Sequence, residues 1–181
     1  MKIISKNGNA YTYPSITCKK IIYEYGFKAM TLNMQSTQSH STDSKRPAIQ
    51  FSMNKTITEP SGKLEPHEQG LHLCELFSDV ILSYRPDNKI SQQTKESQKY
   101  RYFFCKTGDI CITEHDIFRK DTCFVTNELT PLFEIDMTKF KGNHKNKEEL
   151  NKFAKQQIVE YFTEKNIDNI TDKDIEITNF I

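Results

Sequence analysis

Four residues in the second half of the chain have side chains that bind zinc. Cys105, Cys111, His115 and Cys123 follow the spacing C-x5-C-x3-H-x7-C, and thiolate and imidazole are the ligands of tetrahedral zinc sites. Structural zinc sites usually contain a CxxC pair, because a short loop presents two thiolates to one ion, and no CxxC occurs here. A hairpin turning at Gly108 would bring two of these cysteines to one face in only one of its registers. The four residues are therefore a candidate metal site, while our expectation is a protein without a cofactor.

The segment 99–106, KYRYFFCK, combines aromatic and basic side chains. This composition is typical of surfaces on which single-stranded nucleic acid stacks, where each base is worth roughly 1–3 kcal/mol. Aromatic residues in a central strand serve equally well as core and cross-strand packing. The candidate binding residues are Tyr100, Arg101, Tyr102, Phe104 and Lys106.

The segment PHEQGLH places His67 and His72 five residues apart. A zinc protease helix needs a separation of four, because five residues turn a helix by about 500° and point the two imidazoles in different directions. The chain also contains no P-loop, dinucleotide-binding glycine pattern or G-x-S-x-G motif. We therefore expect a protein that is not an enzyme.

Composition limits the classes of partner. Lysine and arginine number 25 against 24 aspartates and glutamates, a formal charge of +1, so no overall field draws the chain to nucleic acid or to an anionic membrane. No apolar run is long enough for a membrane span or a signal peptide. Five cysteines form an odd set without CxxC pairs, which favours reduced thiols. These features predict a soluble, cytoplasmic protein.

The hydrophobic pattern predicts the elements that would position these residues. Turn residues Asn7 and Gly8 predict a hairpin over 1–14, and apolar positions at helical spacing predict helices over 66–84 and 148–165. Asn146 and Glu149 fit a capping box before the second helix. Alternating apolar residues predict strands over 48–57 and 170–181 and extended chain over 27–34, while 15–25 fits either a short helix or a strand.

The densest strand-forming region, 99–139, is expected to form a meander of four strands, with turn residues at 106–109 folding the second strand back on the first. We therefore predict a single α+β domain over 1–181: a mainly antiparallel sheet centred on this meander and packed by two amphipathic helices. Polar segments at about 35–47, 87–98 and 141–147 are expected to be mobile loops.

The function that these observations favour is binding to another protein, as an inhibitor, an immunity-type protein or an assembly subunit does. The alternative is a single-stranded nucleic-acid-binding domain that uses the aromatic and basic residues of segment 99–106. Neither hypothesis involves a membrane.

Overall fold

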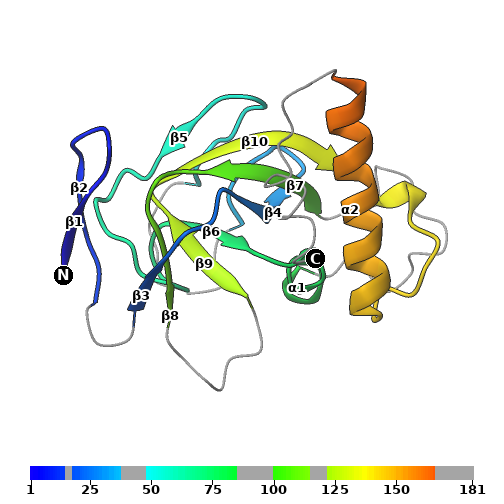
Figure 1. Ribbon diagram of the computed structural model, residues 1–181, viewed down its shortest axis with the longest axis horizontal. Coiled ribbons are helices and arrows are strands. Elements are labelled where there is room, and N and C mark those ends of the chain that lie inside the picture. The colour runs from blue at the N-terminus through cyan, green and yellow to red at the C-terminus, as the bar shows by residue number, and fades with distance from the viewer. Residues whose placement is uncertain (15–17, 38–47, 85–99, 115–121, 166–181) are drawn as a thin grey trace.

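The computed structural model describes residues 1–14, 18–37, 48–84, 100–114 and 122–165 (Figure 1). In these residues an eight-stranded sheet, a separate two-stranded hairpin and two α-helices are formed, so the predicted α+β class is confirmed. The elements are β1 Lys2–Ile4, β2 Ala10–Thr12, β3 Cys18–Ile21, β4 Tyr25–Thr31, β5 Ile57–Thr58, β6 Leu71–Cys74, α1 Phe77–Ser83, β7 Tyr100–Thr107, β8 Cys111–Glu114, β9 Cys123–Thr126, β10 Glu128–Ile135, a 3-10 helix Met137–Lys139 and α2 Lys147–Glu164.

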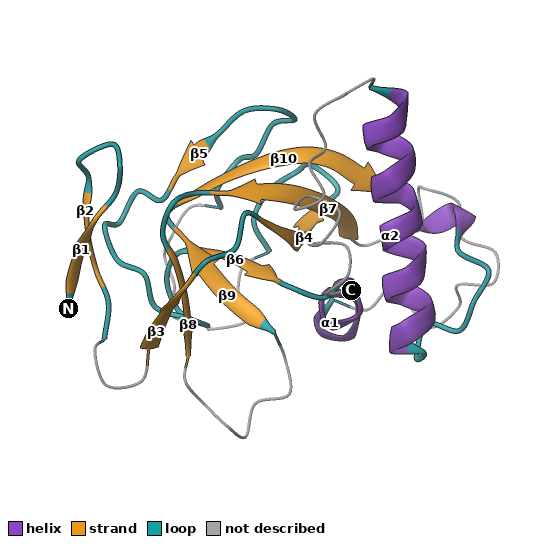
Figure 2. Cartoon of the chain, in the orientation of Figure 1, coloured by secondary structure: helices purple, strands orange, loops and turns teal. Residues whose placement is uncertain are grey.

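The order of strands in the large sheet is β3-β8-β9-β6-β4-β7-β10-β5, and every neighbouring pair is antiparallel. Both helices lie toward one end of this sheet, and the β1–β2 hairpin lies at the other (Figure 2). No helix in the described part of the chain has both the length and the apolar character needed to cross a membrane.

A long, bent, two-stranded ribbon organises the sheet. One arm is β7 followed by β8, the other is β9 followed by β10, and the arms pair on both sides of the bend: Leu129 opposes Thr107, and Thr126 opposes Cys111. The four predicted strands therefore exist, but the predicted meander is wrong in its connectivity. Instead of folding back on β7, β8 continues past the bend to pair with β9 and β3.

The bend is stabilised by polar groups buried inside it. Asn127 is fully buried, and its side-chain oxygen accepts the Ile110 N–H (3.1 Å) while its amide donates to Asp109 (2.9 Å). The Thr126 hydroxyl donates to the Ile110 carbonyl (2.9 Å) and accepts the Gly108 N–H (3.1 Å). A Cβ at Gly108 would clash with the Asn127 side chain. The sequence KTGD thus makes a bend in a continuous strand in place of the predicted hairpin turn.

β4 and β6 close the sheet on itself. β6 pairs with β9 on one side and β4 on the other, and β4 pairs with β7. Since β7 and β9 belong to the two arms of the ribbon, the sheet curls around an interior cluster of buried side chains. These are Met30, Phe51, Leu71, Leu73, Phe103, Cys105, Cys111, Phe124 and Leu129.

The helices cover the opposite face of the curled sheet. α1 and α2 pack over a second cluster that includes Phe27, Tyr102 and Phe104, together with Val80 and Leu150 from the helices. Asn146 caps α2 as predicted, because its side-chain oxygen accepts the N–H groups of Glu148 and Glu149, and the helix follows the predicted 148–165 segment closely.

A buried carboxylate joins α1, the start of α2 and the residue that precedes β9. Asp79 in α1 is 2% exposed and accepts the backbone N–H and the hydroxyl of Thr122 (both 3.0 Å). Its second oxygen is 2.9 Å from the Lys147 ammonium at the start of α2. Three donors therefore compensate the burial of one charge.

One predicted helix is confirmed only in its last part, one predicted strand is wrong, and the alternative of helix or strand at 15–25 is resolved for the described residues. The segment 66–84 is β6 and the shorter α1, because Leu71 and Leu73 alternate into the sheet interior and the ladder to β9 overrides the helical spacing. Most of 48–57 is irregular, with only an isolated bridge at Gln50 before β5. The described part of 15–25 is strand, namely β3 and the start of β4.

The other predicted elements have mixed outcomes. The hairpin at the N-terminus is confirmed, with Gly8 at a φ of 81° in its turn. The extended segment 27–34 is confirmed over most of its length as β4. The segments 87–98 and 170–181 lie outside the described residues, as does most of the 35–47 loop. The 141–147 connector is largely exposed and leads directly into α2.

Removing the Asn127 side chain tests the role of the bend. Asn127→Ala leaves the buried Ile110 N–H without its acceptor, and an unsatisfied buried group of this kind costs about 1–3 kcal/mol. We expect the free energy of unfolding in urea to fall by that amount. The matched change at the exposed Asn33, Asn33→Ala, should stay within about 0.5 kcal/mol of the wild type. Equal effects of the two changes would contradict the proposed role of Asn127.

Candidate binding pocket

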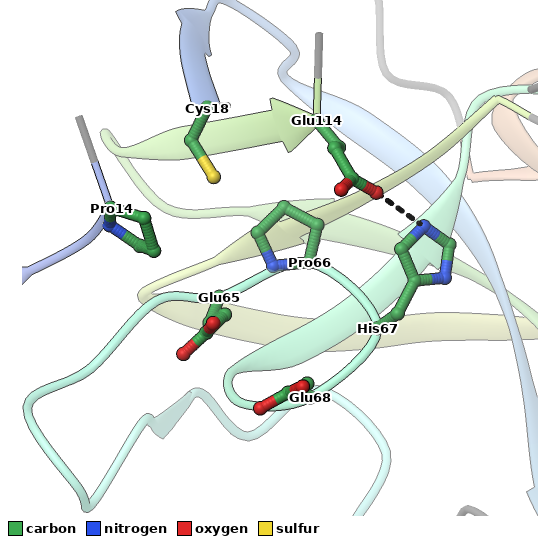
Figure 3. Close-up of a pocket in the computed structure, with 7 residues that line it drawn as sticks. All are labelled: Pro14, Cys18, Glu65, Pro66, His67, Glu68 and Glu114. Atoms are coloured by element: carbon green, nitrogen blue, oxygen red, sulfur yellow. Dashed lines mark ion pairs between the residues drawn. The ribbon is translucent and has the colours of Figure 1, made fainter. Parts of the chain in front are cut away.

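A small pocket lies where the β3 edge of the sheet meets the turn before β6 (Figure 3). It encloses about 140 Å³. Pockets for small-molecule ligands usually occupy about 300–1,000 Å³, so this one matches the end of a single side chain better than a metabolite. Its lining residues are Pro14, Cys18, Glu65, Pro66, His67, Glu68 and Glu114.

The sheet places two of the lining residues side by side. Cys18 begins β3 and opposes Glu114 at the end of β8. β3 pairs with β8 and is the first strand in the order of the sheet, so the pocket lies at the end of an edge strand. Figure 3 shows the Cys18 sulfur pointing into the space between the two prolines.

The floor of the pocket is a tight turn. The Glu65 carbonyl accepts the N–H groups of Glu68 (3.0 Å) and Gln69 (2.8 Å), and Glu65 N–H donates to the Gln69 carbonyl (2.7 Å). His67 has a φ of 67°, in the left-handed region that non-glycine residues seldom adopt. Backbone strain of this type clusters at binding and catalytic sites, because the surrounding structure must stabilise it.

The pocket is acidic. Three of its seven lining residues are glutamates and none is lysine or arginine. The Nε2 atom of His67 lies 3.8 Å from a carboxylate oxygen of Glu114, and both side chains are 29% exposed. This contact is an ion pair only when the imidazole is protonated, and an exposed pair of this kind contributes about 0–1 kcal/mol. The carboxylates therefore make the pocket attractive to a cation.

The aromatic segment predicted to bind nucleic acid forms part of the core. Tyr102 is 1% exposed and Phe104 is 3% exposed, and both face the helices. The Tyr102 hydroxyl donates to the Tyr84 carbonyl (2.6 Å), and the Phe104 ring stacks on Tyr25. Neither ring presents a face on which a base could stack.

The other predicted binding residues of that segment are less buried than Tyr102 and Phe104. The guanidinium of Arg101 binds both carboxylate oxygens of Glu134 (3.1 and 2.7 Å) and lies over the Phe103 ring. Tyr100 packs edge-on against Tyr84, and Lys106 is exposed. The five predicted binding residues thus belong to two faces of β7 and form no common surface.

The described cysteines of the candidate metal site lie in two different places. Cys105 and Cys111 both point into the interior cluster of the curled sheet, so these two thiols do share a face. Cys123 instead lies against Cys74, with 3.0 Å between their sulfur atoms, and His115 is outside the described residues. Among the described residues, no three metal-binding side chains are grouped to hold an ion.

A buried lysine and a partly buried histidine lie beside the interior cluster. Lys28 in β4 is 7% exposed, and its ammonium donates to the His72 carbonyl (2.7 Å) and lies over the Phe51 ring. Burial lowers the pKa of Lys28 to about 8, although the neighbouring thiols of Cys105 and Cys74 oppose this shift. Burial and the Lys28 charge lower the pKa of His72 to about 3, so this imidazole is neutral.

Sequence reasoning missed the pocket because helical spacing assigns the turn to a helix. On that assignment Pro66 is the first helical position and His67 is part of a failed zinc motif. The available signal was Gly70, which together with Pro66 brackets the three residues 67–69 as a turn. No sequence signal places Glu114 or Cys18 beside this turn, because their approach depends on the pairing of β3 with β8.

Comparison of the chain with models of protein families, with curated proteins and with solved structures found no match. Any function proposed for the chain therefore rests on the geometry of its described residues.

The pH dependence of folding tests the buried state of Lys28. Below pH 8 the folded protein bears the cost of a buried charge; between pH 8 and 10.5 it has lost that proton while the unfolded chain still holds it. Stability attributable to Lys28 therefore rises with pH across this window, by up to about 3 kcal/mol.

The measurement is the free energy of unfolding of the wild type minus that of Lys28→Met, followed from pH 7 to 10.5. Tyrosines and cysteines that also titrate in this range are common to both proteins, and those that do not interact with Lys28 cancel in the difference. A difference that stays constant with pH would show that Lys28 is not charged and buried together in the folded protein.

Proposed function

We propose that this protein is a binding module that recognises another protein through the β3 edge and the acidic pocket. A segment of the partner lies along β3 in extended conformation and places a lysine or arginine side chain in the pocket. In this arrangement the main chain supplies affinity and the pocket supplies specificity. The observation that carries the proposal is the position of three glutamates around a pocket of side-chain size at the end of an edge strand.

The edge strand itself supports the proposal. In the described part of the chain, β3 pairs only with β8, and a strand at the edge of a sheet has backbone N–H and C=O groups directed away from its neighbour. Ile22 directly after β3 is 91% exposed, so an apolar contact is available beside the ladder. Lys19 and Lys20 are exposed on the strand, and lysines on an edge oppose non-specific pairing with other chains.

The charge of the pocket selects the residue that enters it. A partly exposed carboxylate paired with a cation is worth up to about 1 kcal/mol, and an unpaired carboxylate desolvated by a neutral side chain is unfavourable. The carboxylates of Glu65 and Glu68 therefore favour a basic side chain over an apolar one, and Glu114, beside His67, adds to the negative charge of the pocket. This mode of action is that of an inhibitor, an immunity-type protein or an assembly subunit, and requires no catalytic residue.

Peptide selection tests the proposal without knowledge of the natural partner. A displayed library of random linear peptides is selected on the immobilised full chain, and the affinities of the selected peptides are measured by calorimetry. We expect enrichment of lysine or arginine at one position. Glu65→Gln/Glu68→Gln should weaken binding about tenfold, the effect of losing two pairs of up to about 1 kcal/mol each.

The matched control removes two exposed carboxylates from α2, with the same change in net charge. Glu160→Gln/Glu164→Gln should leave the affinity for the selected peptides unchanged. Selected peptides without a basic residue, or peptides that bind both double variants equally well, would contradict the proposed function.

A further inference from the structure

We propose that Cys74 and Cys123 form a redox-responsive pair, which a hydroperoxide converts to a reversible disulfide that ties β6 to β9 at the start of α1. This inference is independent of the proposed binding function. The two residues oppose each other in the β6–β9 ladder, and their sulfur atoms are 3.0 Å apart. A disulfide bond is about 1 Å shorter, so a small movement of the side chains closes it.

The ladder gives the pair a backbone geometry that permits a disulfide. The next pair along the strands is hydrogen-bonded, since the Glu75 N–H donates to the Thr122 carbonyl (3.1 Å). Hydrogen-bonded and non-hydrogen-bonded pairs alternate in an antiparallel ladder, so Cys74 and Cys123 occupy a close, non-hydrogen-bonded position, where Cα atoms are about 4.5 Å apart. This separation lies within the range of about 4.4–6.8 Å found for disulfides.

The two thiols differ in their exposure to solvent, and this difference predicts the order in which they react. Cys123 is partly exposed, whereas Cys74 is 4% exposed. The oxidant therefore meets Cys123 first, and Cys74 acts on the product. Cys105 and Cys111 are buried in the interior cluster, and burial raises the pKa of both thiols, to about 12 for Cys105. Buried thiols of that kind react poorly, because the thiolate is the nucleophile.

The chemistry balances with a hydroperoxide as the only oxidant. The Cys123 sulfur attacks one peroxide oxygen, so that an S–O bond forms, the O–O bond breaks and the leaving oxygen takes the thiol proton to depart as water or alcohol. The Cys74 sulfur then attacks the sulfenic sulfur of Cys123; the S–S bond forms, the S–O bond breaks and water leaves with the Cys74 proton. Two thiols are oxidised by two electrons, and a dithiol reductant reverses the reaction.

The position of the pair gives the bond a structural consequence. Thr122, next to Cys123, is hydrogen-bonded to the buried Asp79 of α1, which in turn pairs with Lys147 of α2. On the other strand, Cys74 is separated from α1 by only Glu75 and Leu76. A disulfide between the strands therefore reinforces the joint at which β9, α1 and α2 meet.

Limited oxidation of the folded full chain tests the proposal. The reduced protein is treated with hydrogen peroxide at neutral pH, the peroxide is removed, the remaining thiols are alkylated after unfolding in urea, and the peptides are mapped by mass spectrometry. We expect alkylation at three of the five cysteines and a single disulfide linking the peptides of Cys74 and Cys123. The oxidised protein should unfold at a higher urea concentration than the reduced protein, and dithiothreitol should abolish the difference.

Single substitutions separate this reaction from general thiol oxidation. In Cys74→Ser the reaction should stop at a sulfenic acid on Cys123, which dimedone traps; in Cys123→Ser no disulfide should form. Cys18→Ser, which removes another partly exposed thiol, should oxidise like the wild type. A disulfide that forms only in urea, oxidation confined to Cys18, or a Cys123 sulfenic acid that persists beside an intact Cys74 would overturn the proposal.

Discussion

The bend in the β7–β8 and β9–β10 ribbon is the constraint on which the rest of the fold depends. Asn127 and Thr126 satisfy the backbone groups of Gly108 and Ile110 inside the bend, where water cannot replace them. If the ribbon were straight, the half of the sheet beyond the bend would be exposed. With the bend, both arms of the ribbon contribute strands to the two halves of the sheet, and these halves enclose the interior cluster.

The two candidate functional features, the acidic pocket and the Cys74–Cys123 pair, both involve the strands beyond this bend. β8 carries Glu114 to the turn at His67 and pairs with β3, which supplies Cys18. β9 returns along β6 and places Cys123 against Cys74. The acidic pocket and the dithiol therefore involve the neighbouring strands β8 and β9, and each depends on contacts between residues far apart in the sequence.

Local patterns predicted those parts of the fold that depend on local chemistry. Asn7 and Gly8 formed their hairpin, and Asn146 capped its helix, because both signals act within a few residues. The segment around Leu71 followed tertiary pairing with β9 rather than its helical spacing. Gly108 shows that local patterns do not determine which strands pair. A turn signal predicts only that the chain changes direction, and the buried Asn127 decides whether a hairpin or a bend forms. The pocket could not be predicted, since its residues come from three separate segments.

Nuclear Overhauser contacts between backbone protons test the bent ribbon most directly. We predict cross-strand contacts between Cys111 and Thr126 and, in the same molecule, between Thr107 and Leu129. Both sets should be present in the reduced, unliganded protein. A local hairpin would instead give contacts between β7 and β8 across Gly108 and would lack the contact between Thr107 and Leu129. That result would contradict the bend and, with it, the placement of the pocket and of the cysteine pair.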